Sequence, residues 1–356
     1  MASILDSREK INELDKSNLV RSVEVLGDQI QDAWEATNTL VFPSDYSGVK
    51  NIVVSGMGGS NLGSLVIKRL FKDELTLPLE VYPHYHLPGY VNSDTLVLLS
   101  SYSGTTEETL AAAEQAKESG AKIAVITGGG KLAQMAKDNS WPMYLIDAKF
   151  NPSKQPRMAI GYAVFGQLSM FAKMGLINIS ESQVLNLADN LRQLAVNLGP
   201  EKEHNAAKLL AFSAFDKHTI FVAAEHLIGA AHVINNQFNE NAKALTSEWH
   251  LPEFNHHYME ALSFPKLAKD TTIFFLFNSP LYHERVQKRV LLTKELIESK
   301  GYEVQLIQST APSKLEQVFE IIQLGEFVAA YLPVLYGIAD PGPVPNVEWF
   351  KSQMSK

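Results

Sequence analysis

Hydroxyl side chains cluster in one short segment that directly follows an apolar run at 95–100. The four hydroxyls are those of Ser101, Ser103, Thr105 and Thr106. Two glutamates and a series of good helix formers come next, so we expect a helix to begin there. The first N–H groups of a helix, its positive dipole end and nearby hydroxyls together bind anions well. One hydroxyl is enough to cap a helix, so four favour a phosphate site over ordinary capping.

A second loop that could bind phosphate is GMGGSNLG at 56–63, which also follows a short apolar segment. It does not match a P-loop, because no GK[ST] follows, and its glycines do not meet the G-x-G-x-x-G spacing of dinucleotide-binding loops. Glu80 lies at a plausible distance for a ribose contact, so a nucleotide site remains an alternative. The interpretation we favour is that Gly58, Gly59 and Ser60 form one wall of a small sugar-phosphate pocket.

Apolar segments in the first half alternate with helical patterns, which is typical of a doubly wound, mostly parallel sheet. The expected strands are 51–55, 79–82, 95–100, 122–127 and 143–146, and helices are expected at 156–176, at 181–198 and within the first 42 residues. The two candidate phosphate loops then follow neighbouring strands at the carboxyl edge of the sheet. Such folds bind their ligands at that edge.

The second half repeats this alternation with little sequence identity to the first. Strands are expected at 218–223, 271–278 and 302–307, and helices at 203–214, from about 225, at 283–300 and at 314–335. We therefore predict an α/β fold of two αβα sandwich domains, each with a mostly parallel five-stranded sheet. A helical N-terminal segment is placed at 1–48, the first domain at 49–198 and the second at 199–356.

Composition excludes several classes of function. The 356 residues suggest two domains, and a hydrophobic content of 46% is enough for a large core. The net charge of −8 argues against a nucleic-acid-binding protein. No cysteine is present, which excludes disulfides, thiolate nucleophiles and cysteine metal sites. The charged N-terminus does not resemble a signal peptide, and no unbroken apolar run is long enough to span a membrane, so we expect a cytoplasmic protein with no membrane association.

Longer motifs narrow the function. GMGGSNLG together with SYSGTTEET is similar to a sugar isomerase (SIS) domain, and two such domains in tandem resemble the phosphoglucose isomerase superfamily. QPRMAIGY at 155–162, NQFNENAKALTSEWHLPEFNHH at 236–257 and LYGIADPGPVPNVEWFK at 335–351 resemble the bifunctional phosphoglucose/phosphomannose isomerase family. The resemblance implies two SIS-type domains that interconvert glucose 6-phosphate, and mannose 6-phosphate, with fructose 6-phosphate. It implies no cofactor.

The resemblance also implies roles for individual residues. Interconverting an aldose and a ketose phosphate requires ring opening, proton transfer between C1 and C2, and stabilisation of an enediolate. Glu240 matches the family's base, which carries the proton. Arg157 matches the arginine that stabilises the enediolate. His256, in an N-H-H motif where the family usually has N-H-N, and Lys351 match the groups that open the ring.

The phosphate loops and the quaternary structure follow from the same resemblance. Ser101, Ser103 and Thr106 would hold the 6-phosphate, with Gly58, Gly59 and Ser60 on the adjoining turn. The histidine of conventional phosphoglucose isomerases comes from the partner subunit, which implies a homodimer that shares His256 between subunits. No HExxH motif is present, so no set of metal ligands can be identified and we expect a metal-independent reaction.

Two other functions remain open. SIS domains also occur in regulators, so a non-catalytic sugar-phosphate-binding protein is one alternative. An isomerase for another sugar phosphate is the other. The family's DPTPV reads DPGPV here, and Gly342 therefore replaces a threonine associated with the C2 epimer. This departure bears on the mannose 6-phosphate reaction, whereas the glucose 6-phosphate reaction needs only the four residues assigned to catalysis.

Overall fold

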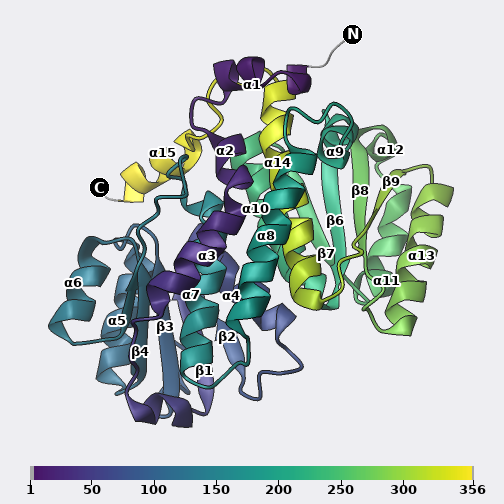
Figure 1. Ribbon diagram of the computed structural model, residues 1–356. Coiled ribbons are helices and arrows are strands. Elements are labelled where there is room, and N and C mark those ends of the chain that lie inside the picture. The colour runs from purple at the N-terminus through teal and green to yellow at the C-terminus, as the bar shows by residue number, and fades with distance from the viewer. Residues whose placement is uncertain (1–3, 355–356) are drawn as a thin grey trace.

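The computed structural model describes residues 4–354 and contains two parallel β-sheets flanked by helices (Figure 1). The first sheet has five strands in the order β2-β1-β3-β4-β5. Its strands are β1 (Asn51–Gly56), β2 (Leu79–Val81), β3 (Thr95–Ser101), β4 (Lys122–Thr127) and β5 (Met143–Leu145). All residues of the central strand β3 are buried, which explains its apolar sequence without alternation. The five strands predicted for the first half are confirmed.

The second sheet has four parallel strands in the order β7-β6-β8-β9 within residues 4–354. They are β6 (His218–Ala224), β7 (Thr246–Leu251), β8 (Thr272–Asn278) and β9 (Glu303–Gln308). The prediction of a five-stranded second sheet was therefore wrong. Residues 336–354 instead form a loop with Pro341 and Pro343 and a helix that begins at Pro345, and proline has no N–H to donate to a strand ladder.

Strand β7 was not predicted. It reads TSEWHL, and five of its six residues are only half-buried because it lies at the edge of the sheet. An edge strand needs no continuous apolar run, so the pattern that revealed the central strands is missing here.

Helices connect the strands and cover the faces of both sheets, and only some of them lie between the sheets. They are α4 (Gly59–Leu70), α5 (Glu107–Glu118), α6 (Gly130–Asp138), α7 (Ile160–Lys173), α8 (Glu181–Leu198), α9 (Ala206–Ala214), α10 (Ile228–Gln237), α11 (Phe254–His257), α12 (Ala268–Thr271), α13 (Glu284–Ser299), α14 (Lys314–Leu335) and α15 (Pro345–Met354). One continuous cluster of buried apolar side chains contains residues of both sheets, such as Val54 and Phe275. The two halves of the chain therefore share a core.

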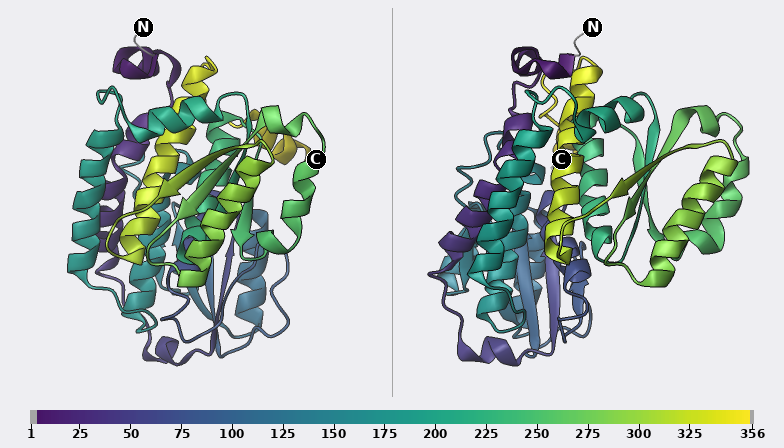
Figure 2. Two further views of the ribbon diagram at one scale, coloured as in Figure 1. Left: turned by 90° about the vertical axis from the view of Figure 1, so that its right-hand side faces the viewer. Right: turned by 45° about the vertical axis from the view of Figure 1, so that its right-hand side comes forward.

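Helix α14 is long and apolar enough to cross a membrane by length and composition alone. However, 83% of its most apolar window is buried inside the protein. It lies between the two sheets, where it packs against α8, α9 and α10 (Figure 2). Its composition is therefore that of a central core helix.

The N-terminal segment is helical, as predicted, and contains α1 (Arg8–Leu14), α2 (Leu19–Glu24) and α3 (Leu26–Thr37). The chain turns at Asn18, whose φ is 57°, and the carboxylate of Asp15 accepts hydrogen bonds from the first two N–H groups of α2. Helix α3 packs against α7 and α8, and α2 packs against α14. This segment is therefore part of the layer between the sheets.

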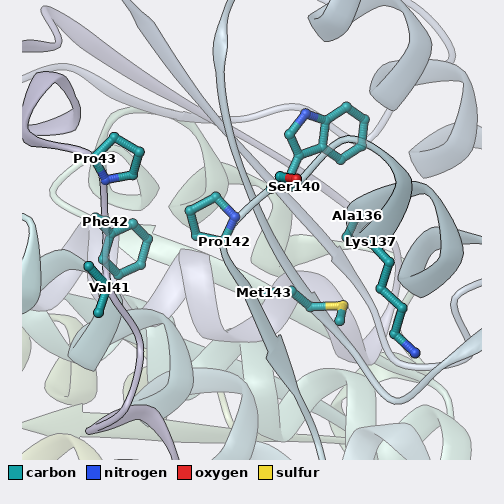
Figure 3. Close-up of a pocket in the computed structure, with 9 residues that line it drawn as sticks. Val41, Phe42, Pro43, Ala136, Lys137, Ser140, Pro142 and Met143 are labelled. Atoms are coloured by element: carbon teal, nitrogen blue, oxygen red, sulfur yellow. The ribbon is translucent and has the colours of Figure 1, made fainter.

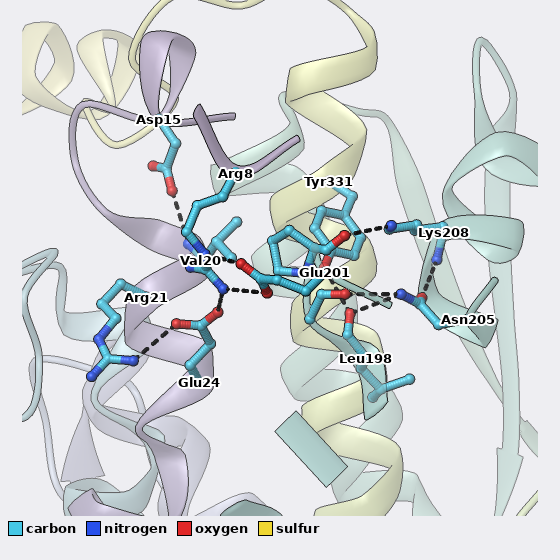
Figure 4. A network of polar contacts seen from close by, with 12 residues as sticks. Arg8, Asp15, Val20, Arg21, Glu24, Leu198, Glu201, Asn205, Lys208 and Tyr331 are labelled. Atoms are coloured by element: carbon cyan, nitrogen blue, oxygen red, sulfur yellow. Dashed lines mark hydrogen bonds and ion pairs between the residues drawn. The ribbon is translucent and has the colours of Figure 1, made fainter. Parts of the chain in front are cut away.

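A polar network ties the N-terminal segment to the connection between the two halves (Figure 4). Arg8 bonds to Glu24 at 2.6 Å and also to Glu201. The buried ammonium of Lys208 donates at 2.8 Å to Asp6 and at 2.9 Å to the carbonyl of Pro200. These contacts fix the link between the domains, and with it the relative position of side chains that come from different halves.

Candidate active site

Glu240 lies on an unusual helical turn. After α10 the helix continues as a π-helical segment, Phe238–Ala242, which ends at Lys243 in the left-handed conformation. π-Helical turns are rare and occur often at functional sites. The Glu240 side chain is 31% exposed, so it is accessible to a small molecule while being largely surrounded by protein.

Arg157 faces Glu240 from the short 3-10 turn Pro156–Met158, which precedes α7. Its side chain is buried, and its Nη1 lies 3.3 Å from Oε2 of Glu240. The guanidinium also donates to Asn241 Oδ1, to Gln155 Oε1 at 2.9 Å and to the carbonyl of Gly342 at 2.6 Å. These four partners use the fork geometry of arginine and hold the cation in one orientation.

The charges around the pair act in opposite directions. Burial raises the pKa of Glu240, while the positive charges of Arg157, Lys243 and Lys351 oppose that rise. Burial lowers the pKa of Arg157, and the Glu240 carboxylate opposes the shift. A carboxylate whose pKa lies above its ordinary value is a better proton acceptor near neutral pH.

Lys351 is exposed on α15, and its positive charge acts to lower the pKa of Glu240. The position of α15 depends on Lys243, whose Nζ donates to the carbonyls of Glu240 at 2.6 Å, Pro341 at 2.9 Å and Pro343 at 2.6 Å. Lys243 therefore connects the proline-rich loop before α15 to the turn that carries Glu240 through hydrogen bonds.

The two candidate phosphate loops are brought together as predicted from their strands. The N–H of Tyr102 donates to Ser60 Oγ at 2.9 Å, and Ser100 Oγ donates to the carbonyl of Ser60 at 2.7 Å. A Cβ at Gly59 would lie 2.8 Å from the backbone nitrogen of Arg157. The glycine turn thus packs directly on the segment that carries the arginine, and Gly58 adopts a φ of 51°.

The hydroxyls of the other turn are in different environments. Ser101 is 1% exposed, and its Oγ contacts Thr106 Oγ1 at 2.8 Å and accepts from the N–H of Gly104 at 3.1 Å. Ser103 is exposed and accepts from the Thr105 hydroxyl at 3.2 Å. Ser101 therefore shapes the turn from within, whereas Ser103 and the start of α5 face solvent.

His256 does not join this group within one chain. It is exposed on α11, which follows β7, whereas Glu240 lies on the turn that precedes β7. Six strand residues span about 17–20 Å. Figure 1 likewise shows α11 well separated from α15, the helix that carries Lys351.

A surface hollow of about 440 Å³ lies elsewhere (Figure 3). One wall is formed by residues 41–43, which precede β1, and the other by residues between 136 and 143, which lead into β5. The lining residues include Phe42, Trp141 and Met143. This is the amino edge of the first sheet, whereas both phosphate loops lie at the carboxyl edge. None of the predicted site residues lines the hollow.

Comparison with known proteins agrees with the motifs. Residues 203–354 match the model of the bacterial phospho-glucose isomerase C-terminal SIS domain, and residues 45–146 match the SIS domain. The bifunctional phosphoglucose/phosphomannose isomerase of Caldicellulosiruptor bescii is 33% identical over 95% of this chain and 99% of its own length. That of Aquifex aeolicus is 31% identical over 88% of this chain and 92% of its own. The chain belongs to the bifunctional phosphoglucose/phosphomannose isomerase family.

Other similarities extend beyond this family. A D-glucosamine-6-phosphate 4-epimerase of Sulfolobus acidocaldarius is 30% identical over 66% of this chain and 72% of its own. Among solved structures, a hypothetical protein from Thermus thermophilus has a TM-score of 0.71 at 17% identity, covering 93% of this chain and 90% of its own. A likeness at that identity shows the shared fold alone.

Several residues that surround Glu240 and Arg157 were not predicted from the sequence. Gln237 and Lys243 lie three residues before and after Glu240, so helical spacing alone could have drawn attention to them. Asn241 and Gln155 are further side-chain partners of Arg157, and both lie within the motifs around Glu240 and Arg157 that the sequence had already indicated. Within the described residues, no group of three or more His, Asp or Glu side chains is arranged to hold a metal ion.

Proposed function

We propose that the protein interconverts glucose 6-phosphate and fructose 6-phosphate, and mannose 6-phosphate with the same ketose. The observation that carries the proposal is the pairing of Glu240 and Arg157, a carboxylate and a guanidinium 3.3 Å apart that come from different domains. Family membership supports the same reaction class.

Substrate binding begins at the two turns that follow β1 and β3. The N–H groups at the starts of α4 and α5, with Ser60, Ser103 and Thr106, hold the 6-phosphate, and Ser101 holds the second turn in shape. A sugar anchored at its phosphate extends toward Arg157, because the Gly59 turn packs on that segment. Fixing the phosphate turns the proton transfer into an oriented, effectively intramolecular step.

Glu240 then moves the proton. It removes the proton from C2 of the aldose and returns it to C1, which leaves a ketose; a positioned base of this kind accelerates the step about 10²–10⁴-fold. Negative charge develops on the enediolate oxygens between these two events. Arg157 stabilises that charge, since its other hydrogen bonds hold the guanidinium in place before the reaction.

Ring opening uses Lys351 and a histidine from a second copy of the chain. His256 is exposed and lies beyond the far end of β7, so His256 of one subunit serves the Glu240 site of the other. Helix α15 supports a dimer as well, because none of its residues is buried while Trp349 is 65% and Phe350 57% exposed. Large exposed apolar side chains of this kind mark interaction surfaces. We also propose that the protein acts in the cytoplasm.

A coupled assay tests the reaction. Fructose 6-phosphate is supplied, and glucose 6-phosphate and mannose 6-phosphate are followed separately with and without EDTA, for the wild type and for Glu240→Gln. We expect turnover of the wild type that survives EDTA, and a loss of about 10²–10⁴-fold in the variant. No product of either kind from the wild type would exclude the reaction. Full activity of Glu240→Gln would exclude only the assignment of the base.

D-Glucosamine 6-phosphate belongs in the same experiment, because a relative with 30% identity is named for its 4-epimerisation. Turnover of this amino sugar in the absence of any fructose 6-phosphate turnover would favour that second function over the first.

A further inference from the structure

A carboxyl group that the proposed mechanism does not use lies beneath the site. Glu326 is 1% exposed and lies in the middle of α14, where the apolar sequence FVAAYL follows it directly. Burying a carboxyl group in such surroundings is unfavourable unless hydrogen bonds compensate. A lone acidic residue at this position therefore needs a specific explanation.

Glu326 is connected to Arg157 through one residue. Gln237 Nε2 donates to Glu326 Oε1 at 2.7 Å and to the main-chain carbonyl of Arg157 at 2.9 Å. Gln237 is the last residue of α10 and lies three positions before Glu240. The amide group of Gln237 thus contacts the backbone of Arg157. Gln237 itself lies directly before the π-helical turn that carries Glu240.

The packing of α14 on α10 leaves little freedom for this connection. At Gly325, next to Glu326, a Cβ would lie 2.3 Å from the side chain of Ile234 on α10. The two helices therefore approach as closely as the glycine permits. The separation of the Glu326 and Gln237 side chains is fixed by that contact, since interiors packed at this density do not yield easily.

We propose, on the basis of the isomerase function above, that Glu326 is a positioning residue for the reaction. Acting through Gln237, it fixes the backbone of Arg157 and the turn that carries Glu240, so that guanidinium and carboxylate keep their mutual orientation.

The protonated form of Glu326 suits this role. Oε2 of Glu326 and Oε1 of Gln237 are both buried and have no hydrogen-bond partner among residues 4–354. Burial raises the pKa of Glu326 to about 8, and the hydrogen bond from Gln237 opposes that rise. A neutral carboxyl group makes Oε2 a donor, and Gln237 Oε1 is an acceptor without a donor. Protonation therefore allows carboxyl and amide groups to pair through two hydrogen bonds.

Three variants separate this role from a general effect on stability. Glu326→Gln keeps the shape and places a donor and an acceptor where the neutral acid has them. Glu326→Met keeps the length of the side chain and removes both the hydrogen-bond donor and the acceptor. Gln323→Met is the matched control, because Gln323 is also fully buried on α14 but donates at 3.2 Å to the carbonyl of Val23, away from the site.

The readouts are kcat, KM and the acid limb of the pH profile of kcat/KM, measured below the melting temperature of each variant. Arg157, Lys243 and Lys351 are the charged groups that act on Glu240, and all three lower its pKa. If Arg157 moves away, the pKa of Glu240 rises and the acid limb shifts to higher pH. A purely structural defect lowers the amount of active enzyme without moving that limb.

We expect Glu326→Met to lose about 10- to 100-fold in kcat with little change in KM, because a small displacement of reacting groups is that costly. Its acid limb moves to higher pH, whereas Glu326→Gln and Gln323→Met keep the wild-type profile. A folded Glu326→Met variant with wild-type kcat and acid limb would overturn the proposal.

Three further outcomes are informative. If Glu326→Met does not fold, Gln237→Met takes its place, and an unshifted acid limb with unchanged kcat in that variant overturns the proposal equally. If Glu326→Gln is as inactive as Glu326→Met, the neutral-acid arrangement is wrong. An inactive wild type would instead remove the isomerase function on which this inference rests, and the wild-type assay reveals that first.

Discussion

Arg157 and Gly342 lie 185 positions apart in the chain and are joined directly, because Nη2 of Arg157 donates a hydrogen bond of 2.6 Å to the carbonyl oxygen of Gly342. The same glycine touches the N-terminal segment. A Cβ at this position would lie 2.1 Å from Ser17 Oγ, and Ser17 in turn bonds to Asp340. The loop that receives the arginine is therefore held by two distant parts of the chain, the turn of Arg157 and the N-terminal segment.

This contact predicts the effect of a side chain at position 342. We expect Gly342→Ala to cost about 1–3 kcal/mol in the free energy of unfolding and to lower kcat, because the added carbon displaces the loop that holds Arg157. Ser17→Gly in the same chain removes the obstacle and should restore part of both, because it also removes the hydrogen bond from Ser17 to Asp340. Thermal unfolding and the coupled assay on both single variants and the double variant measure this. A double variant as impaired as Gly342→Ala would show that Ser17 is not the cause.

Replacing Arg157 by lysine tests the role of the guanidinium. A lysine keeps the charge but cannot make four directed contacts, so we expect kcat to fall about 100-fold or more while KM changes little. Arg192→Lys is the control, because Arg192 pairs with Asp28 and Asp189 at the surface of the helical layer. Equal activities of the two variants would contradict an electrostatic role for Arg157.

The C-terminal helix allows a test that leaves the core intact. No residue of α15 is buried, so deleting residues 349–356 should leave a cooperative melting transition within a few degrees of the wild type. Turnover should be lost, because Lys351 is removed. Lys351→Met reports the contribution of the ammonium group alone. Activity that survives the deletion would rule out Lys351 as a participant in ring opening.

Subunit mixing tests the shared site. Glu240→Gln and His256→Ala should each be inactive alone, but a mixed dimer contains one site with both native residues. Random pairing should restore about a quarter of the wild-type activity, since half of the dimers are mixed and each has one working site. Co-expression with two affinity tags provides the mixed dimers. An inactive mixed dimer of confirmed composition would mean that His256 and Glu240 of the same chain act together, or that His256 acts elsewhere.

The pH dependence of stability follows from Glu326. Its pKa is about 8 in the folded protein and ordinarily 4.5, so folding favours the protonated form. The stability that it contributes is complete below about pH 4.5 and is lost as the pH rises toward 8. Glu326→Gln has no such loss. We expect its melting temperature relative to the wild type to increase by about 2–5 °C between pH 5 and pH 8.5. A constant difference across this range would indicate an unshifted carboxyl group.

The sequence alone was sufficient for the features that depend on local pattern. Buried parallel strands such as β3 and β8 have apolar side chains on both faces, so they were recognisable as continuous runs. The glycine and hydroxyl loops and the family motifs are also contiguous in sequence. They predicted two α/β domains, and they predicted that Ser60 and the turn after β3 would meet at one sheet edge.

Only the tertiary structure decided how distant groups contact one another, even where the family resemblance had assigned them to one reaction. Glu240 and Arg157 are 83 positions apart, and their contact depends on a core shared by both sheets. Strand β7 gave no apolar pattern because an edge strand is half-exposed. The role of Glu326 was equally hidden, since an acidic residue in an apolar helix has the same sequence signature whether it faces solvent or an amide group. Burial and hydrogen-bond partners depend on the packing of α14 against α10, and that packing is not a property of either segment alone.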